Sequence, residues 1–206
     1  MLPGLKPFPP TRVVVPGWQQ FTASGGFIVP EYDTLTVTIN GATGGGGGGG
    51  YCTATYNPGL DGGAGGYYTY SYQTGYAGSA GGQSKFNSST ALIANSGAGG
   101  SPGSSSAGAN GSSGTASGPP GAILTTGGSN RPVGSYGNGT GSGCSGGRGG
   151  YGGAGGKAVM TWNLGDPGAP VPGETIPVTI GSGGNRSTTY STSGYGSAGV
   201  IDVAWA

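Results

Sequence analysis

The stretch GCSGGRGGYGGAGG, which runs from Gly143 to Gly156, carries glycine at every third position in two interleaved series. One series runs from Gly143 to Gly155 and the other from Gly147 to Gly156. A three-residue period is that of the extended polyproline II helix, which rises about 3.1 Å per residue and has no internal hydrogen bonds. Its N–H and C=O groups must therefore bond to neighbouring segments or to water. The repeat predicts either closely packed polyproline II helices or a disordered glycine-rich tract.

The composition favours the ordered alternative. Glycine fills 54 of the 206 positions, apolar residues make up 33% and charged residues only 6%. Low charge argues against ordinary disorder, which combines weak hydrophobicity with high net charge. Leu, Ile, Val and Phe are nevertheless too few for a conventional core, and fixing glycine costs more backbone entropy than fixing other residues. We therefore expect backbone hydrogen bonds to supply much of the stability.

Shorter glycine triplets of the same spacing recur before this stretch, in a phase that changes from one to the next. They are Gly59, Gly62 and Gly65; Gly75, Gly78 and Gly81; Gly97, Gly100 and Gly103; and Gly108, Gly111 and Gly114. The changing phase excludes collagen, whose Gly-X-Y register is strict. It suits several short extended helices that are joined by turns.

Strand-like segments lie on both sides of the glycine-rich middle. Residues 35–40 (LTVTIN) alternate apolar and hydroxyl-bearing side chains, as a half-buried strand does. In 200–206, the same alternation places Ile201, Val203 and Trp205 on one face and Asp202 on the other. Further strands are expected within 18–29, 158–162 and 175–181.

These observations predict an all-β fold with almost no α-helix. A small, sandwich-like β framework is expected to hold glycine-rich polyproline II-type helices packed in layers. Residues 1–17, with five prolines, form an extended arm, because proline disfavours helix and central strand. Residues 18–206 form a single domain, with a low-complexity insertion at about 41–156.

The two cysteines, Cys52 and Cys144, flank glycine-rich tracts. A disulfide between them would close a loop of about 90 residues and contribute roughly 4 kcal/mol. Two reduced, packed thiols are the alternative, and they suit synthesis in a cytoplasm. The sequence leaves both alternatives open.

The sequence argues against an enzyme and against a cofactor or a metal site. It contains no His, the commonest acid–base residue. Glu31 and Asp33 are close in sequence, but they sit in a turn-like cluster after Pro30, and Asp61, Asp166 and Glu174 stand beside Gly or Pro. No Gly-Lys-Ser/Thr follows the glycine runs, so they are not phosphate loops.

The net charge and the hydropathy argue against two kinds of partner, nucleic acid and the membrane interior. A net charge of +1 gives no basic footprint for nucleic acid. No run of 18 or more apolar residues is present, so we expect no membrane insertion. The first residues do not resemble a signal peptide, and we expect synthesis in a cytoplasm.

Tyrosines form the candidate binding surface. Tyr67, Tyr68, Tyr70, Tyr72 and Tyr76 cluster within ten residues, after Tyr51 and Tyr56. Tyrosine offers rigid contact area with a polar tip, which favours recognition surfaces. In a strand, Tyr68, Tyr70 and Tyr72 would share one face. The alternative is that these rings cover the edge of the glycine layers.

Three segments together resemble the glycine-rich domains of bacteriophage tail-fibre and related virion proteins. They are Phe27-Ile28-Val29-Pro30 with the strand at 35–39 and the glycine run from Gly41; the segment from Pro172 to Gly184 (PGETIPVTIGSGG); and Gly199-Val200-Ile201-Asp202-Val203. The resemblance covers about 27–50 and 156–206. The proline-rich arm and the long Ser- and Tyr-rich middle depart from it.

The resemblance implies a protein of the virion. In some phage adhesins of this kind, glycine-rich tracts pack as layers of polyproline-type helices and loops at the tip touch the host receptor. We therefore expect a tail-fibre or tail-tip component for host-surface recognition. Its partners would be other virion proteins, copies of itself and a bacterial surface glycan or protein. A capsid decoration or tail-assembly protein without a receptor role, and a free structural or ice-binding protein, are the alternatives.

Overall fold

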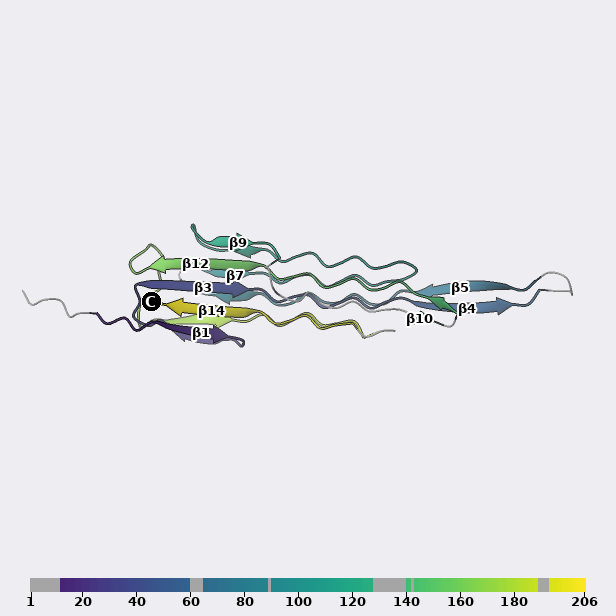
Figure 1. Cartoon of the computed structure of the whole chain (residues 1–206), viewed down its shortest axis with the longest axis horizontal. Helices are drawn as coiled ribbons and strands as arrows, with labels where there is room; N and C mark the ends of the chain where they lie inside the picture. The colour runs from purple at the N-terminus through teal and green to yellow at the C-terminus, as the bar shows by residue number, and fades with distance from the viewer. Residues whose placement is uncertain (1–11, 60–64, 89, 128–139, 142, 189–192) are drawn as a thin grey trace, which may run out of the picture.

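A computed structural model gives the fold and describes residues 12–59, 65–88, 90–127, 140–141, 143–188 and 193–206. Residues 1–11 of the expected arm, Asp61 and the triplet member Gly62 lie outside the described residues. The molecule is elongated, with most strands at one end, a β-hairpin at the other and glycine-rich segments running between them (Figure 1).

Two five-stranded antiparallel sheets form a β-sandwich at one end. The first has the order β1 (Gly17–Phe21), β14 (Val200–Trp205), β3 (Thr34–Asn40), β12 (Lys157–Asn163) and β9 (Ile123–Thr125). The second has the order β2 (Gly25–Ile28), β13 (Thr175–Thr179), β6 (Ser84–Phe86), β7 (Leu92–Ala94) and β8 (Ala116–Ser117). The expected all-β framework is therefore confirmed, and β1 begins at the last residue of the expected arm.

The alternating strands supply the core between the two sheets. Leu35, Val37 and Ile39 of β3 are buried, and their neighbours in the strand are partly exposed. The centre holds aromatic rings, with ring centroids 6.0 Å apart between Phe27 and Phe86 and 6.5 Å apart between Phe86 and Trp162. The period-two pattern of residues 35–40 thus predicted the buried face correctly.

The last strand also follows its predicted alternation. Ile201 and Val203 are buried in the core, and Trp205 packs against it. Asp202 lies on the opposite face, where its Oδ1 accepts a hydrogen bond of 2.7 Å from Nε2 of Gln20. That contact joins β14 to β1 on the solvent side of the first sheet.

Glycine-rich segments continue the strands along the long axis of the molecule (Figure 1). They bond to one another through the backbone and are 41–50, 75–83, 95–104, 106–115, 146–156, 181–188 and 193–199. The segments 193–199, 41–50 and 146–156 keep the order of β14, β3 and β12, and form one layer. The segments 181–188, 75–83, 95–104 and 106–115 keep the order of β13, β6, β7 and β8, and form a second layer.

The central segment 41–50 shows the three-residue period in its hydrogen bonds. Every third N–H donates to segment 146–156 over 2.8–2.9 Å: Gly41 to Gly156, Gly44 to Gly153, Gly47 to Gly150 and Gly50 to Gly147. A second set donates to segment 75–83: Gly45 to Ser79 and Gly48 to Tyr76. A third set donates to segment 193–199: Thr43 to Ser197 and Gly46 to Gly194. Successive N–H groups thus point to three different neighbouring segments and return to the same neighbour every third residue, as in a polyproline II-type helix.

The threefold geometry also joins the two layers through the backbone. Gly97, Gly100 and Gly103 of the second layer donate to carbonyls of segment 41–50 in the first. Two β-sheets cannot bond in this way, because strand hydrogen bonds lie within each sheet and side chains fill the space between sheets. The layers therefore lie too close for side chains, and glycine is required where two backbones meet.

The structure corrects two expectations about the glycine-rich middle. The residues 41–156 are not an insertion apart from the framework, because β6, β7, β8 and β9 within them belong to the two sandwich sheets. Gly143, placed at the start of the repeat, instead has a φ of 71° in the turn before β11 (Cys144–Ser145). The packed repeat begins at Gly146 and Gly147, whose backbones contact Gly50 and Ser106.

The described residues contain no helix, and so no helix among them could cross a membrane.

Tyr32 gives the fold a pH dependence at high pH. Its buried hydroxyl donates a hydrogen bond of 2.5 Å to the carbonyl of Pro170. Burial raises the pKa of this hydroxyl above its ordinary value of 10.0, and the Glu174 carboxylate adds to the rise. The folded state therefore holds the proton more tightly than the unfolded state, so the stabilisation is present below pH 10 and is lost as pH rises through the folded pKa.

We expect the free energy of unfolding to fall above pH 10 by up to about 1.4 kcal/mol per pH unit from this group. Denaturant titrations from pH 7 to 11.5 measure the slope. The Tyr32→Phe variant should lose this part of the slope, whereas Tyr67→Phe, which changes an exposed side chain, should keep it. A slope that is the same in Tyr32→Phe and the parent chain would contradict the assignment.

Candidate functional site

A two-stranded hairpin forms the end of the molecule that lies farthest from the sandwich (Figure 1). Its strands are β4 (Tyr51–Asn57) and β5 (Tyr67–Gln73), which pair antiparallel over seven residues each. Both sequences are rich in Tyr and Thr, which favour strands because they fit a pleated surface. Segments 41–50 and 75–83 connect the hairpin to the sandwich.

Three tyrosines lie next to one another on one face of this hairpin, and we call Tyr56, Tyr68 and Tyr70 the tyrosine ladder. Tyr56 and Tyr68 are cross-strand partners with ring centroids 5.1 Å apart. The rings of Tyr68 and Tyr70 are stacked, with centroids 6.5 Å apart. Their exposed fractions are 53% for Tyr56, 58% for Tyr68 and 55% for Tyr70. The ladder is therefore an ordered aromatic surface that faces solvent.

The structure separates the other predicted tyrosines from the ladder. Tyr72 lies on the same face as predicted, but it pairs with Cys52 near the base of the hairpin. Tyr67 pairs with Asn57 and lies on the opposite face, with an exposed fraction of 62%. Tyr76 belongs to segment 75–83, where its carbonyl accepts a hydrogen bond from Gly48.

Tyr56 is the member of the ladder that the predicted binding set did not contain. It sits on the other strand, and its place beside Tyr68 depends on the hairpin register. The signal that could have found it is two Tyr- and Thr-rich stretches separated by a connection that is rich in Gly and contains Pro58. Figure 1 shows that the hairpin of β4 and β5, which carries the ladder, extends beyond the glycine-rich segments.

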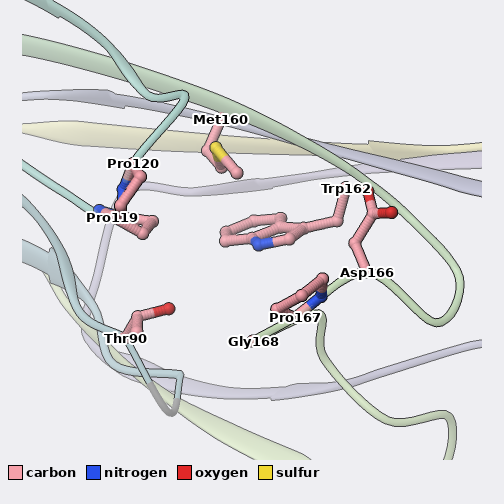
Figure 2. Close-up of a pocket in the computed structure, with 8 residues that line it drawn as sticks. All are labelled: Thr90, Pro119, Pro120, Met160, Trp162, Asp166, Pro167 and Gly168. Carbon is pink, nitrogen blue, oxygen red and sulfur yellow. The ribbon is translucent and has the colours of Figure 1, made fainter.

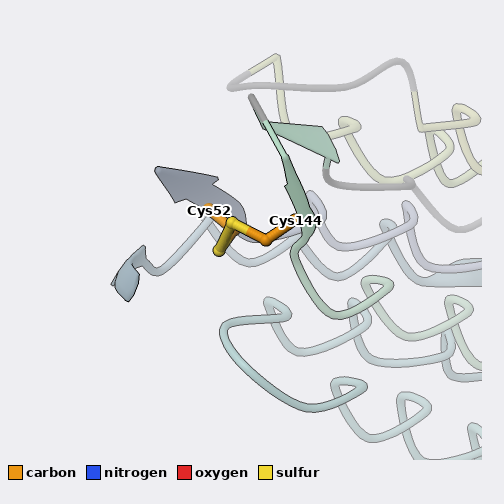
Figure 3. The surroundings of a disulfide bond; sticks show 2 residues. All are labelled: Cys52 and Cys144. Atoms are coloured by element: carbon orange, nitrogen blue, oxygen red, sulfur yellow. A yellow bond between two sulfur atoms is a disulfide. The ribbon is translucent and has the colours of Figure 1, made fainter. Parts of the chain in front are cut away.

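A disulfide fixes the base of the hairpin. Cys52 of β4 is bonded to Cys144 of β11, with a Cα–Cα distance of 5.7 Å and a sequence separation of 92 residues (Figure 3). β11 pairs with β10 (Thr140–Gly141). The disulfide thus decides between the two alternatives left by the sequence, and it ties the ladder-bearing hairpin to the segment 146–156.

Aromatic, hydroxyl and amide side chains make up most of the two strands that carry the ladder. The strands read YCTATYN and YYTYSYQ, without an acidic or basic side chain. Their polar groups are hydroxyls and amides; on the opposite face, for example, Asn57 donates a 3.1 Å hydrogen bond to Oγ1 of Thr69. Flat apolar rings among neutral hydrogen-bonding groups suit a ligand that is itself uncharged and rich in hydroxyls.

The described acidic residues have ion-pair or hydrogen-bond partners within the fold. Glu31 and Asp33 both pair with Arg12, over 2.9 Å from Nε to Oε2 and 3.3 Å from Nη2 to Oδ1. Asp166 Oδ2 accepts hydrogen bonds from the backbone N–H and the side-chain amide of Asn163. Among the described residues, no group of three or more His, Cys, Asp or Glu side chains could hold a metal ion.

Comparison with known proteins gives no relative: neither a protein-family model nor a curated protein matches this chain.

Proposed function

We propose that the protein is a bacteriophage virion component that recognises the host surface, at a tail fibre or tail tip, through the tyrosine ladder. The observation that carries this proposal is the ladder itself: three exposed rings in contact, Tyr68 stacked on Tyr70 and tilted against Tyr56, at one end of an elongated body. The resemblance of the strands and glycine runs to tail-fibre domains supports the proposed place in a virion. The ligand we favour is a neutral glycan of the bacterial surface.

The chemistry of the ladder supports a glycan ligand. Aromatic rings pack against the apolar faces of sugar rings, and tyrosine hydroxyls bond to sugar hydroxyls. With ring centroids 5.1 and 6.5 Å apart, the three rings form one contiguous aromatic contact area for such a ligand. Stacking within the ladder and the disulfide at its base hold the rings before binding, which lowers the entropy cost of association.

We expect a Tyr68→Ser or Tyr70→Ser substitution to weaken binding about tenfold, which corresponds to 1.4 kcal/mol for the loss of one aromatic contact. The probes are immobilised bacterial lipopolysaccharides and neutral capsular polysaccharides, together with whole cells. The labelled full-length chain reports the affinity. Thermal unfolding of each variant shows that the fold is kept.

The Tyr67→Ser variant is the matched control, because Tyr67 is equally exposed on the same strand but faces the other way. It should bind as the parent chain does. An equal loss in Tyr67→Ser and Tyr68→Ser would exclude the ladder as the binding face. Absence of binding to every cell and polysaccharide would reject the recognition role.

A structural virion role, as capsid decoration or tail assembly, is the second candidate. Exposed apolar side chains near the sandwich end favour it: Val13, Val15, Trp18 and Ile28. Such residues suit attachment to a neighbouring virion protein. Quantitative mass spectrometry of purified particles separates the candidates, since a decoration protein is present in many copies and a tail-tip protein in few.

A further inference from the structure

The first sheet of the sandwich packs against the second sheet through one face and exposes the other, as β12 shows. Met160 and Trp162 point inward, where they line a pocket of about 480 Å³ (Figure 2). Val159 and Thr161 alternate with them and therefore point outward. We call the outward side chains of β1, β14, β3, β12 and β9, which alternate with the buried ones, the outer face.

The outer face carries one acidic and one basic side chain among its described residues, Asp202 of β14 and Lys157 of β12. Neither has an oppositely charged partner in the part of the chain that the structure describes. Asp202 uses Oδ1 to accept a hydrogen bond from Gln20, which leaves Oδ2 for a cation. A face that holds one unpaired charge of each sign can pair with a second copy of itself.

The strand order makes the outer face symmetric about its middle strand. β3 is the third of five strands, β14 and β12 lie on its two sides, and β1 and β9 form the edges. Asp202 lies opposite Thr38 of β3, and Lys157 lies opposite Asn40. The two charges therefore differ by two residues along the strands, which is about 7 Å.

A twofold axis that runs along β3 would place β14 of each copy on β12 of the other. Packed sheets lie about 10 Å apart, so the Cα atoms of Asp202 and of Lys157 in the second copy would be about 12 Å apart. An aspartate and a lysine side chain together can bridge that span. The same pair forms twice, because a twofold contact joins the same surface of both copies.

The same axis brings together the two large apolar side chains at the edges of the outer face. Trp18 of β1 is 61% exposed and Ile123 of β9 is 69% exposed. Trp18 shares a row with Thr36, and Ile123 shares a row with Thr38. In the second copy Ile123 would thus lie over β1 with the same two-residue offset from Trp18, within reach of the indole. Both edges of the interface would be apolar.

The opposite orientation of the two copies is disfavoured by the same charges. An axis across the strands would lay each strand on its own counterpart. Asp202 would then face the strand that carries Asp202 in the second copy, and Lys157 the strand that carries Lys157. Like charges opposed across an interface are unfavourable. The charges therefore select the parallel arrangement.

The outer face is large enough for a specific contact. Five strands about 4.8 Å apart and the seven residues of β3 define a face of roughly 550 Å². Two such faces would bury about 1,100 Å², just above the roughly 1,000 Å² that a specific interface needs. Thr36 and Thr38 at the centre are small enough for the two sheets to approach closely.

We propose that two copies of the chain pair through this outer face, side by side and pointing the same way. Because the hairpin lies at the far end of each copy (Figure 1), the pair presents both tyrosine ladders at one end. Two ladders on one body bind a surface more strongly than one, through the high effective concentration of the second. The pairing itself does not depend on what the ladder binds.

Charge exchange tests the pairing in the full chain, by sedimentation equilibrium at concentrations up to about 1 mM. Lys157→Asp and Asp202→Lys should each weaken dimerisation at least about tenfold, because each sets like charges against each other. The double variant with both changes should recover most of the affinity, which shows that the single variants have not merely misfolded. Lys85→Asp is the matched control, because Lys85 lies between two buried residues of β6 and so faces out from the second sheet.

Small-angle X-ray scattering tests the orientation. The parallel pair should have a maximum dimension close to that of the monomeric Lys157→Asp variant. A pair of nearly twice that length would overturn the proposal, because it places the hairpins at opposite ends. A parent chain that stays monomeric up to about 1 mM would also overturn it. So would a dimer that Lys157→Asp and Lys85→Asp weaken equally.

Discussion

The Gly47→Ala variant is expected to be less stable than the parent chain by about 3 kcal/mol or more, because overpacking usually costs 1–3 kcal/mol and here both neighbours are backbone. A methyl group at Gly47 would overlap the carbonyls of Ser101 and Gly100 in the adjoining layer. Gly47 also donates its N–H to Gly150, so the segment cannot move away from one neighbour without breaking its bond to another. For a chain of this length, the loss corresponds to a fall in Tm of roughly 6–12 °C.

Gly25→Ala is the matched control. Gly25 lies in β2 with no atom within 4 Å of an added methyl group, and it does not have a positive φ. Both substitutions reduce the entropy of the unfolded chain alike, so their difference reports the contact between layers. Guanidinium titrations give both free energies of unfolding. Equal midpoints for the two variants would contradict close backbone packing at Gly47.

Removal of the disulfide is the second large effect that we expect. Cys52 and Cys144 are separated by 92 residues, and a cross-link of that span stabilises a fold by about 4.5 kcal/mol through the entropy of the unfolded chain. The Cys52→Ala, Cys144→Ala double variant should therefore unfold at a markedly lower temperature. Addition of a thiol reductant should lower the Tm of the parent chain by a similar amount and leave the double variant unchanged.

The disulfide also has a local consequence at the hairpin. Without it, β4 and β5 stay connected to the layers through segments 41–50 and 75–83, but β11 no longer holds their base. We expect glycan binding by the ladder to weaken in the double variant at temperatures where the sandwich remains folded. A parent chain whose Tm does not respond to reductant would show that the disulfide contributes no stability.

Much of the fold could be predicted from periodicity alone. The alternation in residues 35–40 and 200–205 correctly predicted the buried faces of β3 and β14. The three-residue glycine period of 146–156 predicted a polyproline II-type helix. Both predictions rest on local geometry. Side chains on one face of a strand recur every two residues, and positions on one side of a polyproline II helix recur every three, so the spacing of apolar residues or of glycine reveals the backbone conformation.

The arrangement of the layers could not be predicted in this way. Their order follows the order of the strands, and β6, β7 and β8 have only two or three residues each, too few for a periodic signal. The disulfide depends on that order, because Gly50 meets Gly147 only when segments 41–50 and 146–156 are neighbours. The tyrosine ladder was predicted in part, since Tyr68 and Tyr70 share a strand while Tyr56 reaches them through the hairpin register.

The alignment of the glycine segments with the long axis has a mechanical consequence. A force applied between the sandwich and the tyrosine hairpin pulls along segments 41–50 and 75–83, and through the disulfide along segment 146–156. The hydrogen bonds between segments lie across that direction (Figure 1). Such a force loads many bonds in shear at once instead of opening them one after another. Each segment is already extended, at about 3.1 Å per residue, so it has little slack to yield. The glycine-rich region should therefore resist stretching between the sandwich and the hairpin.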